Sequence, residues 1–203
     1  MSLDTFANLK TAIADHLGRS DLTSYIPDFI TLAEARHKRE IRIREMVTRA
    51  AITVNARQIS LPTGFLEAKT FRLLTSPVTV LKPTNFDYMN QVRDETSGKP
   101  SYFVISNEIE FDKTPDSSYS GEIVYYKAFT ALSDGATSNS LLTRAPDSYL
   151  YGALVASAPF LLDDARIQVW NNLYNLAVEG LAHANRQEGH VGPIISRPHG
   201  ATP

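Results

Sequence analysis

The stretch that decides the fold lies in the middle of the chain, at residues 102–129: YFVISNEIEFDKTPDSSYSGEIVYYKAF. Apolar and aromatic residues form three short runs there, at Tyr102–Ile105, Ile109–Asp112 and Glu122–Phe129. Turn-forming residues separate these runs, a pattern that is typical of β-strands joined by tight connections. We therefore expect the middle of the chain to form a small antiparallel β-module, either a sandwich or an open barrel.

Further strand-like runs precede this stretch and extend the module to residues 51–135. Lys69–Thr75 and Val78–Lys82 flank a Ser-Pro turn, and a short helix is predicted to begin near Thr84. Apolar residues also alternate with polar ones on either side of Asn55-Ala56. This alternation predicts a β-hairpin whose apolar positions are Ile52, Val54, Ile59 and Leu61.

Residues 1–50 are predicted to form two amphipathic helices. Apolar residues recur three and four positions apart, which is the spacing of one helix face. Asp4 is a candidate cap for the first helix, Gly18 can end it, and Pro27 suits the first turn of the second. The apolar faces consist of Phe6, Leu9, Ile13 and Leu17 in the first helix, and Ile26, Phe29, Ile30, Ala33, His37 and Ile41 in the second.

Residues 140–188 are predicted to form a second helical pair. Pro146 opens one helix, Pro159 ends or kinks it, and Asp163 caps a longer helix that runs to about Gln187. The stripe of the longer helix consists of Trp170, Leu173, Ala177, Leu181 and Ala184, widened by Ile167, Tyr174 and Val178.

The last fifteen residues, 189–203, read GHVGPIISRPHGATP. Three glycines and three prolines in this stretch are incompatible with a helix or a central strand. The predicted fold class is therefore α+β. Helices from both ends of the chain form one platform, the antiparallel β-module is inserted between them, and an extended C-terminal tail follows.

Composition excludes several classes of protein. The chain of 203 residues has no cysteine, which removes disulfide scaffolds, thiolate metal sites and cysteine nucleophiles. Its net charge of −2 argues against a polybasic nucleic-acid binder. We expect no membrane association, because no segment reaches the roughly 20 apolar residues of a span. The N-terminus lacks the layout of a signal peptide, so we also expect a protein that is not secreted.

Acidic and histidine residues offer little support for catalysis or metal binding. Glu108, Glu110 and Asp112 alternate on one strand face, where they could hold a cation or simply form the solvated face of an edge strand. Asp163-Asp164 is explained by helix capping. His37 lies on an apolar face, as a packed core histidine would, and zinc-site, phosphate-loop and serine-elbow motifs are missing. We expect no enzyme activity, no cofactor and no metal.

Charge is distributed unevenly along the chain. Residues 36–49 carry six basic and two acidic side chains, a net charge of +4, whereas residues 87–134 have a net charge of −5. On a helix, Lys38, Arg39 and Arg42 would cluster opposite the apolar stripe. They are either a solvated face with local ion pairs such as Arg36–Glu40, or a patch that faces phosphates without regard to sequence.

Tyrosines leave a second class of function open. Tyr125, Tyr126 and Phe129, together with Tyr149 and Tyr151, could stack against sugars or bases, although they could equally fill the faces of the sheet and helices. The alternative function is a monomeric carbohydrate- or ligand-binding protein built on the β-module.

Three segments together resemble the head-to-tail adaptor, or head-completion and connector, proteins of tailed bacteriophages. They are TFANLKTAIADHLGRSDLTSYIPDFITLAEARHKREIR, SGKPSYFVISNEIEFDKTPDSSYSGEIVYYKAFTALSD and LLTRAPDSYLYGALVASAPFLLDDARIQVWNNLYNLAVEGLAHANRQ. Each is a pattern of packing and turn residues rather than a catalytic motif, and together they cover most of the chain.

The resemblance implies a structural virion protein without an active site. Such proteins form homo-oligomeric rings, usually of twelve copies, between the portal protein and a tail or nozzle component, where they extend the DNA channel. It implies a place at the neck of the virion after assembly in the host cytoplasm. It also makes residues 189–203, with Val191, Ile194, Ile195 and Arg197, a candidate docking tail for the portal or a neighbouring subunit. Lys38, Arg39 and Arg42 would then face genomic DNA or an acidic partner.

Overall fold

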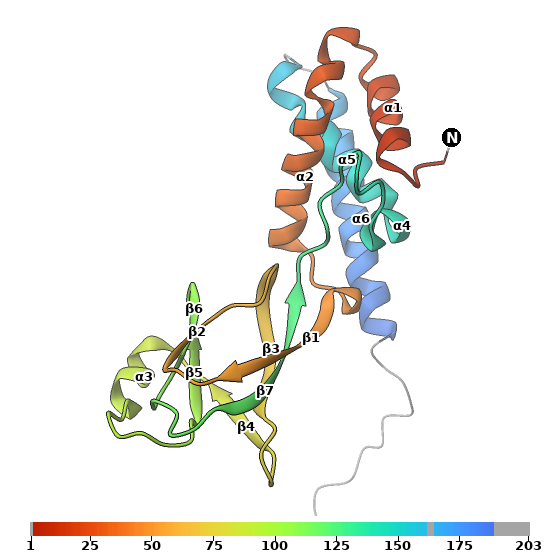
Figure 1. The fold of residues 1–203 in the computed structure, drawn as a ribbon. Helices are drawn as coiled ribbons and strands as arrows, with labels where there is room; N and C mark the ends of the chain where they lie inside the picture. The colour runs from red at the N-terminus through yellow and green to blue at the C-terminus, as the bar shows by residue number, and fades with distance from the viewer. Residues whose placement is uncertain (1, 162–164, 189–203) are drawn as a thin grey trace, which may run out of the picture. The chain divides into compact units, whose positions relative to one another are not determined.

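The structure, a computed structural model, describes residues 2–161 and 165–188. Within them the chain forms six α-helices and seven β-strands, with helices at both ends and strands in the middle (Figure 1). The predicted α+β class is confirmed. The chain divides into two compact units: a helical unit, made of residues up to Ile43 together with those from Ala131 onward, and a sheet unit, Arg44–Thr130. None of the described helices is both long enough and apolar enough to cross a membrane.

The described residues of the helical unit form five α-helices and two 3-10 turns. The α-helices are α1 (Phe6–Leu17), α2 (Ile26–Glu40), α4 (Ser140–Arg144), α5 (Pro146–Ala156) and α6 (Arg166–Glu188). The 3-10 turns are η1 (Ser20–Tyr25) and η3 (Ala158–Phe160).

Local sequence signals explain most ends of these helices. Gly18 ends α1 in the left-handed conformation with φ of 64°, and Pro27 lies in the first turn of α2. The cap of α1 differs from the prediction: the side chain of Thr5, not Asp4, accepts the backbone N–H of Asn8. The carboxylate of Asp4 instead accepts a hydrogen bond from the side-chain amide of Asn8. The predicted cap Asp163 lies outside the described residues.

The core of the helical unit forms where α2, α5 and α6 pack together. Gly152 of α5 makes this close approach possible, because a Cβ there would lie 3.1 Å from Ala33 Cβ and 3.2 Å from the ring of Tyr174. The predicted apolar faces of α1 and α2 are buried, as are Trp170, Tyr174 and Leu181 of α6. Helical periodicity thus identified the side of each long helix that faces the core.

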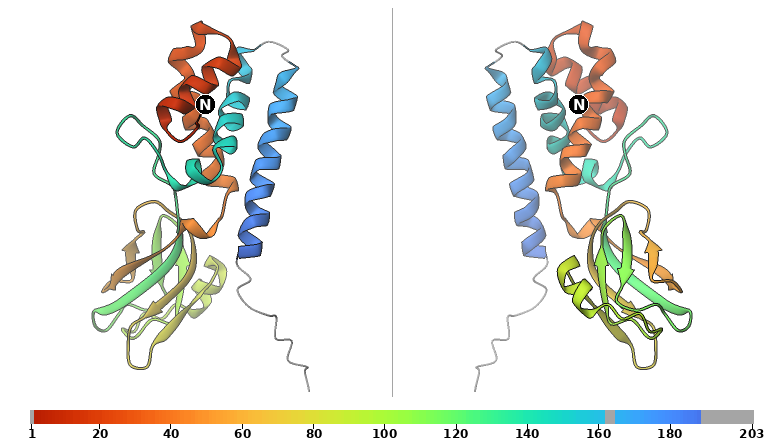
Figure 2. Two further views of the ribbon diagram at one scale, coloured as in Figure 1. Left: turned by 90° about the vertical axis from the view of Figure 1, so that its right-hand side faces the viewer. Right: turned by 90° about the vertical axis from the view of Figure 1, so that its left-hand side faces the viewer.

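The sheet unit is a single seven-stranded sheet in the order β1-β7-β3-β4-β5-β6-β2. Figure 2 shows the ribbon of this sheet from two further sides. Its strands are β1 (Val47–Val54), β2 (Gln58–Ser60), β3 (Phe65–Leu73), β4 (Thr79–Pro83), β5 (Tyr102–Ile105), β6 (Glu108–Phe111) and β7 (Tyr119–Lys127), with helix α3 (Phe86–Val92) and the short turn η2 (Arg44–Met46). The prediction of antiparallel pairing fails for one pair, because β4 and β5 run parallel. A connection through α3 joins them, as parallel strands require.

The predicted hairpin across Asn55-Ala56 is wrong. Both flanking segments are strands, but β1 pairs with β7 and β2 pairs with β6. The sheet curls so that strands far apart in its order share one core: Val54 of β1 packs in the same cluster as Phe111 of β6. Long-range packing therefore outweighs the local pairing of neighbouring strands.

Candidate functional site

Helix α6 has one face in the core and one face in solvent. Trp170, Tyr174 and Leu181 on the inner face are at most 6% exposed. On the opposite side, Val169 is 55% and Leu176 is 63% exposed, and these two residues lie seven positions apart. That spacing places them on one line along the helix. The outer side of α6 therefore carries apolar side chains that no described part of the chain covers.

Gly180 extends this outer face and lies in the middle of a helix. A glycine there costs about 1 kcal/mol relative to alanine. The described structure gives no steric reason for it, since a Cβ at Gly180 would meet nothing within 4 Å. The missing side chain lets another backbone approach α6 closely at this point. We call Val169, Leu176 and Gly180 the outer face of α6.

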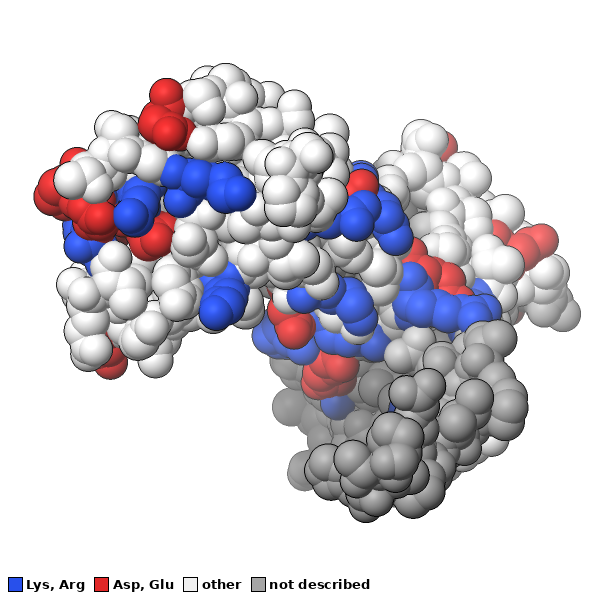
Figure 3. Space-filling model, turned by 90° about the horizontal axis from the view of Figure 1, so that it is seen from below, with Lys and Arg blue, Asp and Glu red and all other residues white. Residues whose placement is uncertain are grey.

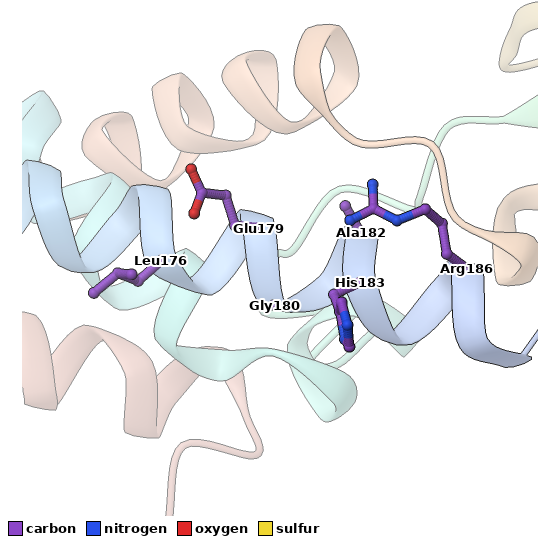
Figure 4. Close-up of a pocket in the computed structure, with 6 residues that line it drawn as sticks. All are labelled: Leu176, Glu179, Gly180, Ala182, His183 and Arg186. Atoms are coloured by element: carbon purple, nitrogen blue, oxygen red, sulfur yellow. The ribbon is translucent and has the colours of Figure 1, made fainter.

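Two hollows adjoin the outer face. One, of about 530 Å³, has only residues of α6 among its described lining (Figure 4), with Glu179 and Arg186 on one flank and His183 on the other. The second, of about 260 Å³, lies between α6 and the junction of α4 with α5. We call the second hollow the α6 groove; it is lined by Arg144, Ala145, Asp147, Leu176, Ala177, Gly180, Leu181 and Ala184.

A buried polar network lies inside the helical unit. A carboxylate oxygen of Glu34 accepts the backbone N–H of Leu132 at 2.8 Å and the hydroxyl of Tyr149 at 3.3 Å. The hydroxyl oxygen of Tyr149 accepts a hydrogen bond from the side-chain amide of Asn139. Burial raises the pKa of both Glu34 and Tyr149. Because Glu34 and Tyr149 are 7% and 1% exposed, this network fixes the 131–139 segment to α2 and α5 rather than meeting a substrate.

His37 is the core histidine that its apolar face predicts. It is 3% exposed and packs between two tyrosines, edge-on to Tyr149 at 4.7 Å and stacked on Tyr174 at 6.0 Å. Burial lowers its pKa to about 4, and the backbone of Ser148 opposes this shift only in part. Neither ring nitrogen makes a hydrogen bond of normal geometry. His37 is therefore a neutral packing residue at neutral pH.

The predicted basic cluster is not confined to one helix. Helix α2 ends at Glu40, so helical spacing does not extend to Arg42 or beyond. Lys38 and Arg39 are exposed on the last turn. Arg42 lies past the end and donates to the carbonyl oxygens of Lys38 and Ile41, both at 2.8 Å, so it caps the helix.

The remaining basic residues of 36–49 have acidic neighbours. Arg36 pairs with Glu40 at 2.9 Å, as predicted, and its guanidinium lies 3.8 Å over the ring of Tyr174. In the sheet unit Arg49 pairs with Glu122 at 3.4 Å. Lysines and arginines lie among acidic side chains on the surface of Figure 3 rather than in one unbroken field. The tail residues Val191, Ile194, Ile195 and Arg197 lie outside the described residues.

The acidic side chains of β6 do not form a metal site. The edge-strand interpretation is wrong, because β6 lies between β5 and β2. Asp112 is 2% exposed and accepts the backbone N–H groups of Ser101 and Tyr102, while Glu110 pairs with Arg93. Across residues 2–161 and 165–188, no three His, Asp or Glu side chains gather closely enough to hold a metal ion.

The tyrosines proposed for ligand stacking are mostly occupied. Tyr125 is 4% exposed and stacks on Phe65, and Tyr149 is part of the buried network. The ammonium group of Lys69 lies over the ring of Tyr126 and donates a hydrogen bond to its hydroxyl. Of the two tyrosines on which the alternative, a carbohydrate-binding module, depended, Tyr125 is therefore buried and Tyr126 is partly exposed beside Lys69.

The sequence interpretation missed the outer face of α6. A signal was present, since Val169 and Leu176 stand seven residues apart and opposite the predicted stripe. The predicted stripe already accounted for the buried side of α6. Val169 and Leu176 therefore looked like the single apolar residues that are common on any protein surface.

Comparison with known proteins identifies a family for this chain. No curated protein matches the chain. Residues 4–197 match the sequence model of the family described as SU10 adaptor protein. This match covers nearly the whole chain and confirms the resemblance seen in the sequence, so the protein belongs to the SU10 adaptor family of phage head-to-tail adaptors.

Proposed function

We propose that this structural phage adaptor works as a subunit of an oligomeric ring of twelve copies. The ring connects the portal protein to a tail or nozzle component, extends the DNA channel and belongs to the neck of the virion after assembly in the host cytoplasm. The family supports the adaptor role. The observation that carries the ring is the outer face of α6, whose exposed apolar residues have no partner among the described residues.

A closed ring needs two different surfaces on each subunit, because head-to-tail contacts join unlike patches. The outer face of α6 supplies one. The helical unit offers a second exposed apolar pair in Tyr25 and Phe160, whose rings lie 5.3 Å apart, and Leu32 of α2 is exposed as well. Apolar patches of this kind on a small unit are typical of protein–protein contacts. We assign these two surfaces to lateral contacts between neighbours.

The tail and the basic residues have separate binding roles in this proposal. Val191, Ile194, Ile195 and Arg197 dock on the portal or on a neighbouring subunit. Lys38, Arg39 and Arg42 face the phosphates of passing DNA or an acidic partner. Contacts to phosphate are independent of base sequence, so they suit a channel through which a whole genome passes.

The mass of the assembled species tests the ring. Native mass spectrometry or analytical ultracentrifugation compares the protein alone with the protein mixed with purified portal ring. We expect added mass equivalent to twelve copies on the portal. A portal that gains no mass at saturating protein would contradict the proposal.

Leu176→Asp tests the lateral surface. A charge buried in an apolar contact is costly, so ring mass on the portal should fall at least tenfold. Gln168→Asp adds the same charge at another exposed position of α6 and serves as the matched control. Equal assembly of the two variants would exclude the outer face from the contact.

Deletion of residues 189–203 tests the tail. Three glycines and three prolines make this segment unsuited to a helix or a central strand, so the truncated chain should keep its circular dichroism spectrum and its unfolding temperature. Its docking on the portal should be impaired. Normal docking of the truncated protein would rule out the tail as a docking element.

Replacement of both Lys38 and Arg39 by Gln tests the basic positions. Binding to duplex DNA of any sequence should weaken and its dependence on salt should become shallower. Lys69→Gln in the sheet unit, which removes one exposed cation elsewhere, is the control. Unchanged DNA binding in the double variant would exclude Lys38 and Arg39 from the DNA contact, and an acidic protein would then be their partner.

A further inference from the structure

Helix α2 has an outward side of its own. Asp28, Leu32, Ala35 and Arg39 are spaced four, three and four residues apart, so they lie on one line along the helix, opposite its buried side. Leu32 is 55% exposed, Asp28 and Arg39 are exposed, and Ala35 is half-buried. This line carries an acid at its start, an apolar middle and a base at its end. We call these four residues the outer face of α2.

Helices α2 and α6 run in the same direction within the helical unit. Arg36 donates to the side chain of Asn175 at 3.4 Å, and Asn185 donates to the carbonyl oxygen of Arg42 at 3.4 Å, so the numbers rise together along both helices. A residue of α2 is therefore level with the residue of α6 whose number is 139 to 143 higher. Arg39 is thus level with the turn of α6 that contains Glu179.

Acidic side chains lie at that level of α6. Glu179 is exposed and has no partner among the described residues. Across the α6 groove, Asp147 lies in the first turn of α5 and accepts only the backbone N–H of Ser148 among its described neighbours. Arg144 of the same groove already interacts within its own chain. The outer face of α6 is therefore flanked by carboxylates at the level where α2 carries its exposed bases.

We propose that the outer face of α2 in one copy packs along the outer face of α6 in the next copy, with the two helices parallel and Arg39 beside Glu179. Rotation about a ring axis that runs along these helices changes neither their direction nor their level. The register within one chain is therefore kept between neighbours. Two unlike helix faces meet, as a closed ring requires.

The charges match along the whole length of this contact. At one end Arg39 of one copy meets Glu179 of the next. Lys38, about 100° around α2 from Arg39, lies on the flank that faces the α6 groove and its Asp147. At the other end Asp28 is level with the first turn of α6, where Arg166 is exposed and donates to the carbonyl oxygen of His16. An antiparallel arrangement would place Arg39 near Arg166 instead.

The apolar middles of the two faces also fit. Leu32 comes level with Asn172 of the neighbouring α6 and fills the space between Val169 and Leu176, one turn to either side. The small Ala35 and Gly180 lie where the two backbones approach most closely, and a Cβ at Gly180 meets no described atom within 4 Å. The contact thus covers the exposed apolar residues of both helices.

This inference rests on the proposed function, because it names the neighbour's surface that the outer face of α6 contacts. It also assigns Arg39 to an acidic partner, a second copy of this chain, rather than to DNA. Other partners for the outer face of α6, such as the same face of another copy, are outcomes of the experiments below.

Charge reversal tests the pairing of Arg39 with Glu179. Arg39→Glu and Glu179→Arg each place like charges together, so the ring mass on the portal should fall at least tenfold in each variant. The chain with both changes restores the attraction and should assemble to within threefold of the parent. Asp15→Arg, at an exposed position of α1, makes the same change of charge elsewhere in the helical unit and is the control.

Two results would overturn the pairing. One is normal assembly of both single variants. The other is a double variant that assembles no better than the single ones while its circular dichroism spectrum equals that of the parent.

A disulfide between two chains tests the register. The chain has no cysteine, so a bond forms only between introduced residues. A chain with Ala35→Cys is mixed with a chain with Leu176→Cys and oxidised, both on the portal and in concentrated protein without it. Because the contact joins unlike faces, the mixture should give a disulfide-linked pair of the two different chains at least tenfold faster than either chain links to itself. The fluorescence of the single tryptophan, Trp170, checks the fold of each variant.

The outcomes separate this contact from the ring itself. Faster linkage of Leu176→Cys chains to each other, or no linkage at all in a protein that adds ring mass to the portal, would overturn the α2–α6 contact and leave the ring intact. A parent chain that adds no mass to the portal would contradict the proposed function. The concentrated mixture then decides the contact alone: linkage of the two different chains supports it, and its absence overturns it.

Discussion

The two compact units bury different kinds of side chain. The core of the sheet unit is a cluster of aliphatic and aromatic residues, with Phe71 in contact with the rings of Phe103 and Phe111. The core of the helical unit contains ionisable groups, Glu34 and His37, alongside its apolar residues. The sheet unit also buries one carboxylate, Asp112, which accepts the backbone N–H groups of Ser101 and Tyr102, but its cluster depends on shape. In the helical unit burial shifts the pKa of Glu34 and of His37, so its stability depends also on their protonation. We propose that the units respond to different perturbations, and four experiments test this contrast.

The largest expected effect comes from Phe71→Ala in the sheet unit. Phe71 is fully buried, and a Cβ at Gly121 would lie 2.9 Å from its ring, so its surroundings are tightly packed. Removing a buried phenyl ring costs about 4 kcal/mol. Hydrogen exchange should show loss of protection in β3, β7 and β5. The unfolding transition followed by Trp170 fluorescence should stay in place, because Trp170 belongs to the helical unit.

Leu81→Ile, a swap of similar volume in the same cluster, is the control and should cost less than about 1.5 kcal/mol. A shift of the Trp170 transition as large as the change in the sheet would show that the two units unfold together and would break the comparison.

Acidification should weaken the helical unit through His37. The pKa of His37 is about 4 when buried and 6.5 in an unfolded chain. Between these values the unfolded state binds the additional proton, so the contribution to stability is full above pH 6.5 and is lost as pH falls toward 4. The loss amounts to about 3 kcal/mol. Urea titrations followed by Trp170 fluorescence at pH 7 and pH 4.5 measure most of it.

His37→Phe keeps an aromatic ring between Tyr149 and Tyr174 but cannot titrate. Glu34 acts in the opposite direction, because burial raises its pKa and its contribution is lost as pH rises. The difference between parent and variant removes the effect of Glu34 and isolates that of His37. An identical pH dependence in both proteins would refute the role of His37.

Glu34→Ala is expected to have a smaller effect, about 2 kcal/mol, because it leaves the buried N–H of Leu132 without its acceptor. Glu34→Gln keeps an oxygen at that place and removes a charge that burial disfavours, so its stability should lie within about 0.5 kcal/mol of the parent. Chemical unfolding at neutral pH compares the two variants. A Gln variant as unstable as the Ala variant would mean that the charge itself, rather than the hydrogen bond, stabilises the segment that contains Leu132.

Sequence patterns predicted the elements of this fold better than their partners. The 3.6-residue period located the core sides of α1, α2 and α6, because that period depends only on one helix and its neighbours in sequence. Alternation identified β1 and β2 as strands, but it carries no information on which strand pairs with which. The pairings β1–β7 and β2–β6 join segments far apart in the chain. These pairings depend on how the sheet curls around Phe71, and a local sequence pattern contains no information on that packing.

The candidate site was predictable in the same partial way. Lys38 and Arg39 could be chosen from their charge, whereas Arg42 required knowledge that α2 ends at Glu40. No strong stop signal stands at that position in the sequence; Ile41 is buried and turns the chain into an extended conformation. Gly180 could be seen as a mid-helix glycine, but only the structure shows that no atom of the described residues lies within 4 Å of the place where its Cβ would be.

The smallest effect concerns two glycines of the helical unit, Gly152 in its core and Gly180 on the outer face of α6. Gly152→Ala should destabilise the protein, since its Cβ would meet Ala33 and Tyr174 at 3.1 and 3.2 Å. Gly180→Ala should stabilise the isolated protein by about 1 kcal/mol, because alanine favours the helix and its Cβ meets none of the described residues within 4 Å. Thermal unfolding measures both changes.

Ring formation by Gly180→Ala then shows whether the outer face of α6 contacts a neighbouring subunit, apart from any change in the stability of the free chain. If a neighbouring backbone approaches α6 at Gly180, the added methyl group keeps it away, and Gly180→Ala should weaken ring formation on the portal while it stabilises the free chain. A substitution that improves the fold and impairs assembly places the role of that residue outside its own fold. If Gly180→Ala gains stability and assembles as the parent does, the outer face makes no close backbone contact, and lateral packing must rest on the side chains of Val169 and Leu176 alone.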